Sequence, residues 1–178
     1  MTSTVGLLAR SRRLARSRRL ARAAAQAAVG VQLWLAAAAV EAGLRVRPLP
    51  ALLAAWAWAA RSPALRWFPA GRAHLGDARL DRLAVAASRR WRGEQACLPL
   101  ALLRCWLAAS AGHHTAVVLG VRRTVATPFT AHAWVEVDGE IHGEPVDPHH
   151  GFHRIARFPL TPPAGQRLAG AQPAGARP

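Results

Sequence analysis

The sequence predicts an α+β fold, in which a helical N-terminal region precedes a core made of one helix packed on a small antiparallel sheet. Apolar residues recur with helical spacing through roughly the first ninety positions. The nearly all-apolar run CLPLALLRCWLAASAG at 97–112 is typical of a buried helix, and the valine-rich residues after it change to the period of strands. With 178 residues, the chain can form one domain with a core and appended segments.

Composition divides the chain into four segments. Residues 1–22 form a basic N-terminal segment, in which the hexamer SRRLAR occurs twice in tandem. Residues 23–92 form the helical region, and residues 93–158 the core that carries the strands. Residues 159–178 are rich in Pro, Gly and Ala without periodicity, and we expect a disordered tail.

Secondary structure is predicted from periodicity and from proline and glycine positions. Beyond the N-terminal helix, we expect helices at Leu52–Ala60, Leu75–Trp91 and about Leu98–Ser110, and strands at about Thr115–Val121, Phe129–Val137 and from near Glu140.

The net charge of +15 comes entirely from arginine, since the chain has no lysine. Asparagine and tyrosine are also absent and isoleucine occurs only twice, so the arginine excess partly reflects a GC-rich genome. The charge permits an acidic peptide, nucleic acid or anionic lipid as partner, but does not by itself indicate one.

The apolar run Ala23–Val40 behind the basic segment has two further interpretations. It resembles a secretory signal, which leaves targeting or membrane association open, and the other alternative is a disordered or misassigned start. We favour a helix of the fold, because the run is mostly alanine, which forms helices well but is only weakly hydrophobic.

The two cysteines, Cys97 and Cys105, bear on the compartment. Eight residues apart on one helix, they lie about 12 Å from each other. This distance is too long for a disulfide. Two unpaired thiols favour a reducing compartment, so we expect a cytoplasmic protein.

Cys97 is the candidate nucleophile. Because proline is tolerated only in the first helical turn, Pro99 predicts that the helix begins within a residue or two of Cys97. There, unpaired backbone amides favour a thiolate and can stabilise an oxyanion. Cys105 lies two turns along inside the apolar helix, and we expect it to pack against the sheet.

His132 is the candidate base, and its orienting acid depends on strand register. In the alternating strand, His132 shares a face with Trp134 and Glu136. A three-residue loop 137–139 would pair Glu136 with Glu140 and Val135 with Ile141, and would bring Glu144 opposite His132. A two-residue turn would instead pair Val137 with Glu140, which sets an apolar residue beside a charged one.

Glu144 is therefore the preferred third residue, and Asp147 the reserve. Asp138 lies about 20 Å along the strand from His132 and is better explained as a turn former. In this arrangement the imidazole takes the thiol proton and the carboxylate fixes the tautomer of the imidazole.

At these residues the sequence resembles the leader peptidases of lasso-peptide biosynthesis. These are cysteine proteases of the transglutaminase-like superfamily, here the protease half of a split B protein. The resemblance rests on Cys97-Leu98 at the start of the Ala/Leu-rich helix, on VVLGVRR at 117–123 and on AHAWVEVDG at 131–139. The N-terminal third is similar only in its composition, which is rich in Arg, Ala and Leu.

The resemblance implies a papain-like core that cleaves a precursor between leader and core peptide, with Cys97 as nucleophile and His132 as base. The implied partners are the precursor, a small leader-recognition protein and an asparagine-synthetase-like macrolactam cyclase. The family usually has Asp where this chain has Glu144, so either Glu144 or Asp147 takes that role.

We expect no metal, no cofactor and no nucleic acid. His142, His149, His150 and His153 cluster near the last predicted strand, and such spacing can bind a transition metal, but no cysteine or carboxylate pattern there matches a known zinc arrangement. Trp134 is expected in the core or as a wall of the cleft.

Two rival functions remain. One is a non-enzymatic adaptor, whose arginine-rich N-terminus would bind an acidic partner, nucleic acid or a membrane surface. The other keeps the fold but transfers the acyl group to an amine instead of water.

Overall fold

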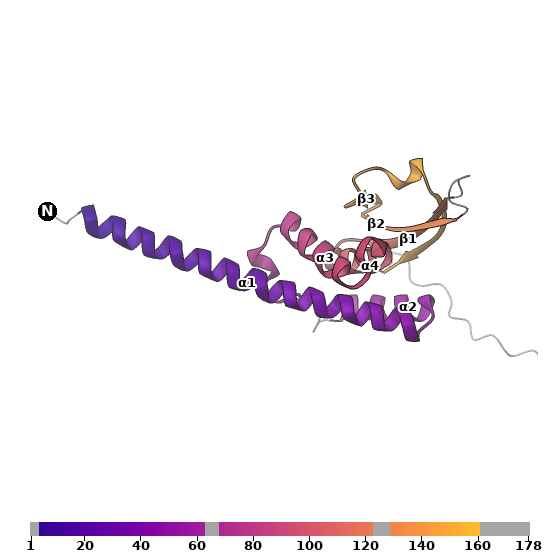
Figure 1. Cartoon of the computed structure of the whole chain (residues 1–178), viewed down its shortest axis with the longest axis horizontal. Coiled ribbons are helices and arrows are strands. Elements are labelled where there is room, and N and C mark those ends of the chain that lie inside the picture. Colours follow the sequence, from indigo (N-terminus) through magenta and orange to yellow (C-terminus); the bar gives the residue numbers. More distant parts are fainter. Residues whose placement is uncertain (1–3, 63–67, 123–128, 161–178) are drawn as a thin grey trace, which may run out of the picture.

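The computed structural model describes residues 4–62, 68–122 and 129–160, and confirms the α+β class (Figure 1). The described elements are the helices α1 (Thr4–Val46), α2 (Leu49–Arg61), α3 (Asp77–Arg92) and α4 (Cys97–Ser110), the strands β1 (Thr115–Arg122), β2 (Thr130–Val137), β3 (Glu140–His142) and β4 (His153–Pro159), and three short 3-10 turns, η1 (Arg72–His74), η2 (Gly93–Gln95) and η3 (Pro148–His150). The strands form one antiparallel sheet in the order β3-β2-β1-β4.

Helix α4 lies between the sheet and the other helices. On one face, Ala101 and Cys105 pack in the same cluster as Val117 of β1 and Ala133 of β2. On another face, Leu103 packs with residues of α1 and α3. Small side chains on the sheet side allow this close approach, as the sequence predicted for Cys105.

Helix α1 continues without a break from the basic segment into the apolar run. Val29, Leu33, Ala37 and Val40 recur with helical spacing and are fully buried, which agrees with the favoured interpretation of this run as a helix of the fold. The N-terminal half of α1 projects beyond the rest of the molecule (Figure 1). By length and composition Arg16–Val46 could also cross a membrane, a property shared by core helices and signal sequences.

Glu41 fixes the C-terminal half of α1 to α3. Its side chain is buried, and its Oε2 accepts a hydrogen bond of 2.7 Å from Nε of Arg92. Helix α2 is held to α4 in a similar way, because Trp56 Nε1 donates to the carbonyl of Leu102 at 3.0 Å.

The prediction of a three-residue loop between β2 and β3 is wrong. The strands pair Val137 with Glu140 and Val135 with His142, which leaves the two-residue turn Asp138-Gly139. Both turn residues have positive φ, 53° and 92°, as a type I′ turn requires. Such a turn matches the strand twist, and Glu140 is exposed, so its pairing with Val137 places no charge in the core.

Strand β4 was not predicted, and the expected tail begins too early. Pro159 still belongs to β4, and Leu160 is buried with its N–H donating to the carbonyl of Thr115 at 3.0 Å. The remaining part of the predicted tail, 161–178, lies outside the described residues.

Candidate active site

The thiol of Cys97 lies at the first residue of α4 and is partly buried. A hydrogen bond with His132 lowers the thiol pKa, and the backbone N–H groups of Ala133 and Leu98 lower it further, against the opposing effect of burial. These contacts stabilise the thiolate over the thiol.

His132 lies between the thiol and a carboxylate. Its Nε2 is 3.1 Å from Oε2 of Glu144, so Nδ1 is the ring nitrogen left for the thiol of Cys97. Hydrogen bonds with Cys97 and with Glu144 raise the pKa of His132 to about 9, although burial opposes this. Phe152 and Trp134 flank the imidazole, with ring centroids 5.2 and 6.2 Å away.

Glu144 reaches His132 by a different path from the predicted one. Continued beyond His142, the observed register would place Glu144 beside Ala133 instead of His132. The strand ends at His142, and Gly143 adopts a positive φ of 78°. The resulting bend turns the Glu144 side chain toward the imidazole. The predicted residue thus makes the predicted contact, whereas the register from which it was inferred is wrong.

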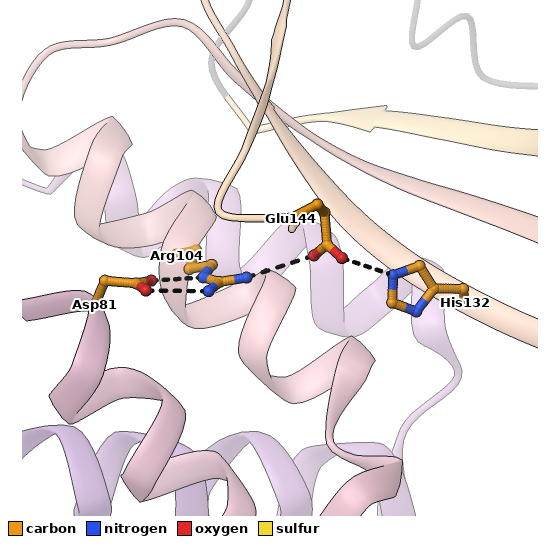
Figure 2. Close-up of polar contacts among 4 residues, drawn as sticks. All are labelled: Asp81, Arg104, His132 and Glu144. Atoms are coloured by element: carbon orange, nitrogen blue, oxygen red, sulfur yellow. Dashed lines mark hydrogen bonds and ion pairs between the residues drawn. The ribbon is translucent and has the colours of Figure 1, made fainter. Parts of the chain in front are cut away.

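Arg104 holds the other oxygen of Glu144, a contact that sequence reasoning missed (Figure 2). Its Nη1 lies 3.4 Å from Oε1 of Glu144, and its Nε and Nη2 donate to the two oxygens of Asp81 at 2.7 and 3.1 Å. The Arg104 side chain is only 9% exposed. One signal was available: Arg104 is the single charged residue of the otherwise apolar α4 sequence. Asp81 of α3 carried no comparable signal.

Two cavities meet at His132, Glu144 and Pro145. The larger, about 640 Å³, is lined by Cys97 and residues 130–133, among others. The smaller, about 340 Å³, lies on the Phe152 side and does not include Cys97. The hydrogen-bonded side chains therefore line a cleft with room for a substrate on both sides.

The remaining candidate residues lie away from this chain of contacts. Asp147 caps η3, accepting a hydrogen bond of 2.8 Å from the N–H of His149. Asp138 forms the β2–β3 turn and accepts from the N–H of His114 at 2.9 Å; its contact with His113 lowers its carboxyl pKa. Cys105 is buried, which raises its thiol pKa to about 12.

Two further expectations concern Trp134 and the histidines. Trp134 is fully buried beneath the imidazole, as a core residue that also supports the cleft. Within the described ranges, no group of three or more His, Cys, Asp or Glu side chains is arranged to hold a metal ion.

The site combines a thiol whose pKa is lowered with an imidazole and a carboxylate in series. Such a series can carry out nucleophilic attack on an acyl group. The family model described as Transglutaminase-like superfamily matches residues 36–157, which include α2 to β3 and most of β4. The chain matches no curated protein and no solved structure. Since the matched residues cover more than half of the sequence and contain Cys97, His132 and Glu144, the chain belongs to the transglutaminase-like superfamily.

Proposed function

We propose that this protein is a cysteine peptidase that removes the leader from a lasso-peptide precursor through a thioester intermediate. One observation carries the chemistry: Cys97, His132 and Glu144 form a continuous hydrogen-bonded series at the mouth of a cleft. This is the arrangement of a nucleophile, a base and an orienting acid.

In the proposed reaction, the imidazole of His132 takes the thiol proton and the Cys97 sulfur attacks the scissile carbonyl carbon. Backbone N–H groups at the start of α4 stabilise the oxyanion. The imidazolium then protonates the leaving amine as the C–N bond breaks, and the acyl group remains on sulfur as a thioester. His132 next deprotonates a water molecule, which attacks the thioester and releases the carboxylate product and the thiol.

The substrate assignment rests on the sequence motifs. Cys97-Leu98 opens α4, VVLGVR at 117–122 lies in β1, and AHAWVEVDG at 131–139 covers most of β2 and its turn. These are the motifs in which the sequence resembles the lasso leader peptidases. The proposal accordingly includes a cytoplasmic protein that works with a precursor peptide, a small leader-recognition protein and a macrolactam cyclase. Glu144 in place of the usual Asp adds one methylene, and its contact with His132 supports Glu144 over Asp147 as the orienting acid.

The test is a cleavage assay with a lasso-peptide precursor sought among the neighbouring open reading frames, with and without a small leader-recognition protein sought in the same place. Mass spectrometry should show leader and core peptides whose masses sum to the precursor plus one water. A leader mass raised by an added amine would instead indicate acyl transfer. Intact precursor with the wild-type protein and its partner would contradict the peptidase proposal.

The adaptor function needs a separate experiment, because α1 carries exposed arginine side chains at 16, 18, 19 and 22. Deleting residues 1–22 should leave cleavage of a minimal peptide intact if the active site carries the function. Loss of biological function on this deletion, with no effect of Cys97→Ala, would favour the adaptor.

A further inference from the structure

Strand β2 has a sheet edge that β3 covers only in part. Strand β3 pairs with residues 135–137 of β2, whereas the stretch from Thr130 to Trp134 has no strand partner on that side among the described residues. This uncovered edge borders the larger cavity of the cleft. An uncovered edge offers backbone donors and acceptors to an extended peptide.

The direction of each backbone group follows from one hydrogen bond. The N–H of Asp138 donates to the carbonyl of His114 at 2.7 Å, toward β1. Because direction alternates along a strand, the backbone groups of residues 131, 133, 135 and 137 point the other way. The backbone hydrogen bond from Ala133 to the Cys97 sulfur agrees with this assignment. Ala131 therefore directs its N–H and its carbonyl into the cleft.

Ala131 lies where a bound peptide would need a partner. It is exposed, lines the larger cavity together with Cys97, and makes no backbone hydrogen bond across the uncovered edge to any described segment. Along β2, Ala131 is two residues from Ala133, or about 7 Å. An extended substrate has the same repeat, so a scissile carbonyl held at Cys97 brings a neighbouring backbone amide opposite Ala131.

The two cavities assign the two ends of the substrate. His132, which protonates the leaving amine, lines both cavities, so the amine side can extend into the smaller cavity, which does not include Cys97. The acyl side stays on sulfur and extends into the larger cavity, which contains both Cys97 and Ala131.

We propose that the acyl side of the substrate binds in an extended conformation to the β2 edge, through backbone hydrogen bonds with Ala131. The inference rests on the proposed peptidase function. The ligand class is an extended peptide that is recognised at this subsite by its backbone, independently of side-chain identity.

The test uses alkylation of the thiol, for which no natural substrate is needed. The probe is acetyl-Ala-Ala-Ala-chloromethyl ketone, from which the Cys97 thiolate displaces chloride to form a thioether; iodoacetamide is the reagent without a peptide. Ala131→Pro removes one edge N–H, which an outward-facing edge position tolerates. We expect about a tenfold slower reaction with the peptide reagent, the effect of one lost hydrogen bond, and an unchanged rate with iodoacetamide.

Phe129→Pro is the matched control, because Phe129 is 66% exposed, precedes β2 and does not line the larger cavity. It should change neither rate. A second arm leaves the protein unaltered: methylating each amide nitrogen of the peptide reagent in turn should slow the wild-type reaction at one position only. If Ala131→Pro misfolds and therefore also loses reactivity with iodoacetamide, the N-methylated reagents alone decide whether the substrate binds to the β2 edge.

The outcomes separate the two proposals. Equal peptide-reagent rates for wild type and Ala131→Pro, with no effect of any N-methyl group, would overturn edge binding and leave the peptidase proposal standing. If wild-type Cys97 reacts no faster than Cys105 with either reagent, the nucleophile assignment fails, and the edge proposal fails with it.

Discussion

Oε2 of Glu144 lies 3.1 Å from Nε2 of His132, although the two residues are not partners in the sheet. The contact depends on the bend at Gly143, after β3 ends at His142. It places a carboxylate that is only 15% exposed on the side of the imidazole away from the thiol. Glu144 can thus orient the imidazole and stabilise its protonated form.

Glu144→Gln should change the pH dependence of cleavage. Hydrogen bonds with Cys97 and then with Glu144 raise the pKa of His132 to about 9, so the imidazolium is lost only as the pH rises through that value. Without the negative charge the pKa falls, and the alkaline limb of kcat/KM moves to lower pH. We also expect kcat/KM at its optimum to fall about 100-fold. Glu140→Gln, at the exposed first residue of β3, is the control. An identical alkaline limb in Glu144→Gln and wild type would contradict this role.

Asp147→Ala separates the preferred acid from the reserve. Because the Asp147 carboxylate caps η3, its loss should lower the free energy of unfolding by about 1 kcal/mol, while kcat stays near wild type. Thermal denaturation and the cleavage assay measure the two effects. An inactive Asp147→Ala together with an active Glu144→Ala would reverse the assignment.

The cysteine pair gives a prediction with a built-in comparison. Cys97→Ala should abolish cleavage without unfolding the protein. Cys105→Ala should keep most activity and cost about 1 kcal/mol of stability, because only a small buried group is lost. Burial raises the pKa of the Cys105 thiol to about 12, so at neutral pH iodoacetamide should label Cys97 alone. Peptide mapping by mass spectrometry checks this selectivity.

Local signals predicted the parts of the site that depend on nearby residues. Pro99 set the helix start at Cys97, and strand alternation put His132 on its observed face. The Gly143 bend could not be predicted in this way, since the residue that an added Cβ would meet there, Arg104, lies 39 residues earlier in the chain. Glu144 contacts His132 although the predicted register was wrong, which shows how weakly register is fixed where β3 has only three residues.

Long-range pairing also explains what the sequence did not predict in the fold. Strand β4 is mostly exposed, with arginines at 154 and 157, so it lacks a clear apolar alternation. Its hydrogen bonds to β1 and the ion pair of Arg157 with buried Glu136, at 2.7 Å, hold it in place. The start and the buried character of α4 could be predicted because their signals are local and strong. The predicted starts of α2 and α3, at Leu52 and Leu75, differ from the observed Leu49 and Asp77.

Arg104→Gln should impair both stability and catalysis. The buried guanidinium bridges Asp81 and Glu144, and its removal takes the ion-pair partner from Asp81 and leaves Glu144 with His132 alone. We expect a loss of about 3 kcal/mol in the free energy of unfolding. We also expect a lower kcat with little change in KM, since Glu144 loses its support. Arg82→Gln, an exposed position on α3, should stay within about 0.5 kcal/mol of wild type. Similar denaturation midpoints for both variants would contradict the structural role of Arg104.

Gly143→Ala tests whether the bend that delivers Glu144 requires glycine. Gly143 has a φ of 78°, and an added Cβ would lie 2.6 Å from Cζ of Arg104, so either the backbone or the guanidinium must move. Gly139→Ala is the matched control: its φ is 92°, but nothing lies within 4 Å of an added Cβ. Both variants should lose about 1 kcal/mol from the positive φ. Only Gly143→Ala should also reduce kcat about tenfold or more, because displacement of Arg104 releases Glu144 from His132. Cleavage assays and thermal denaturation compare the two variants. Equal kcat values at an equal loss of stability would show that the close approach of Gly143 to Arg104 has no part in positioning Glu144.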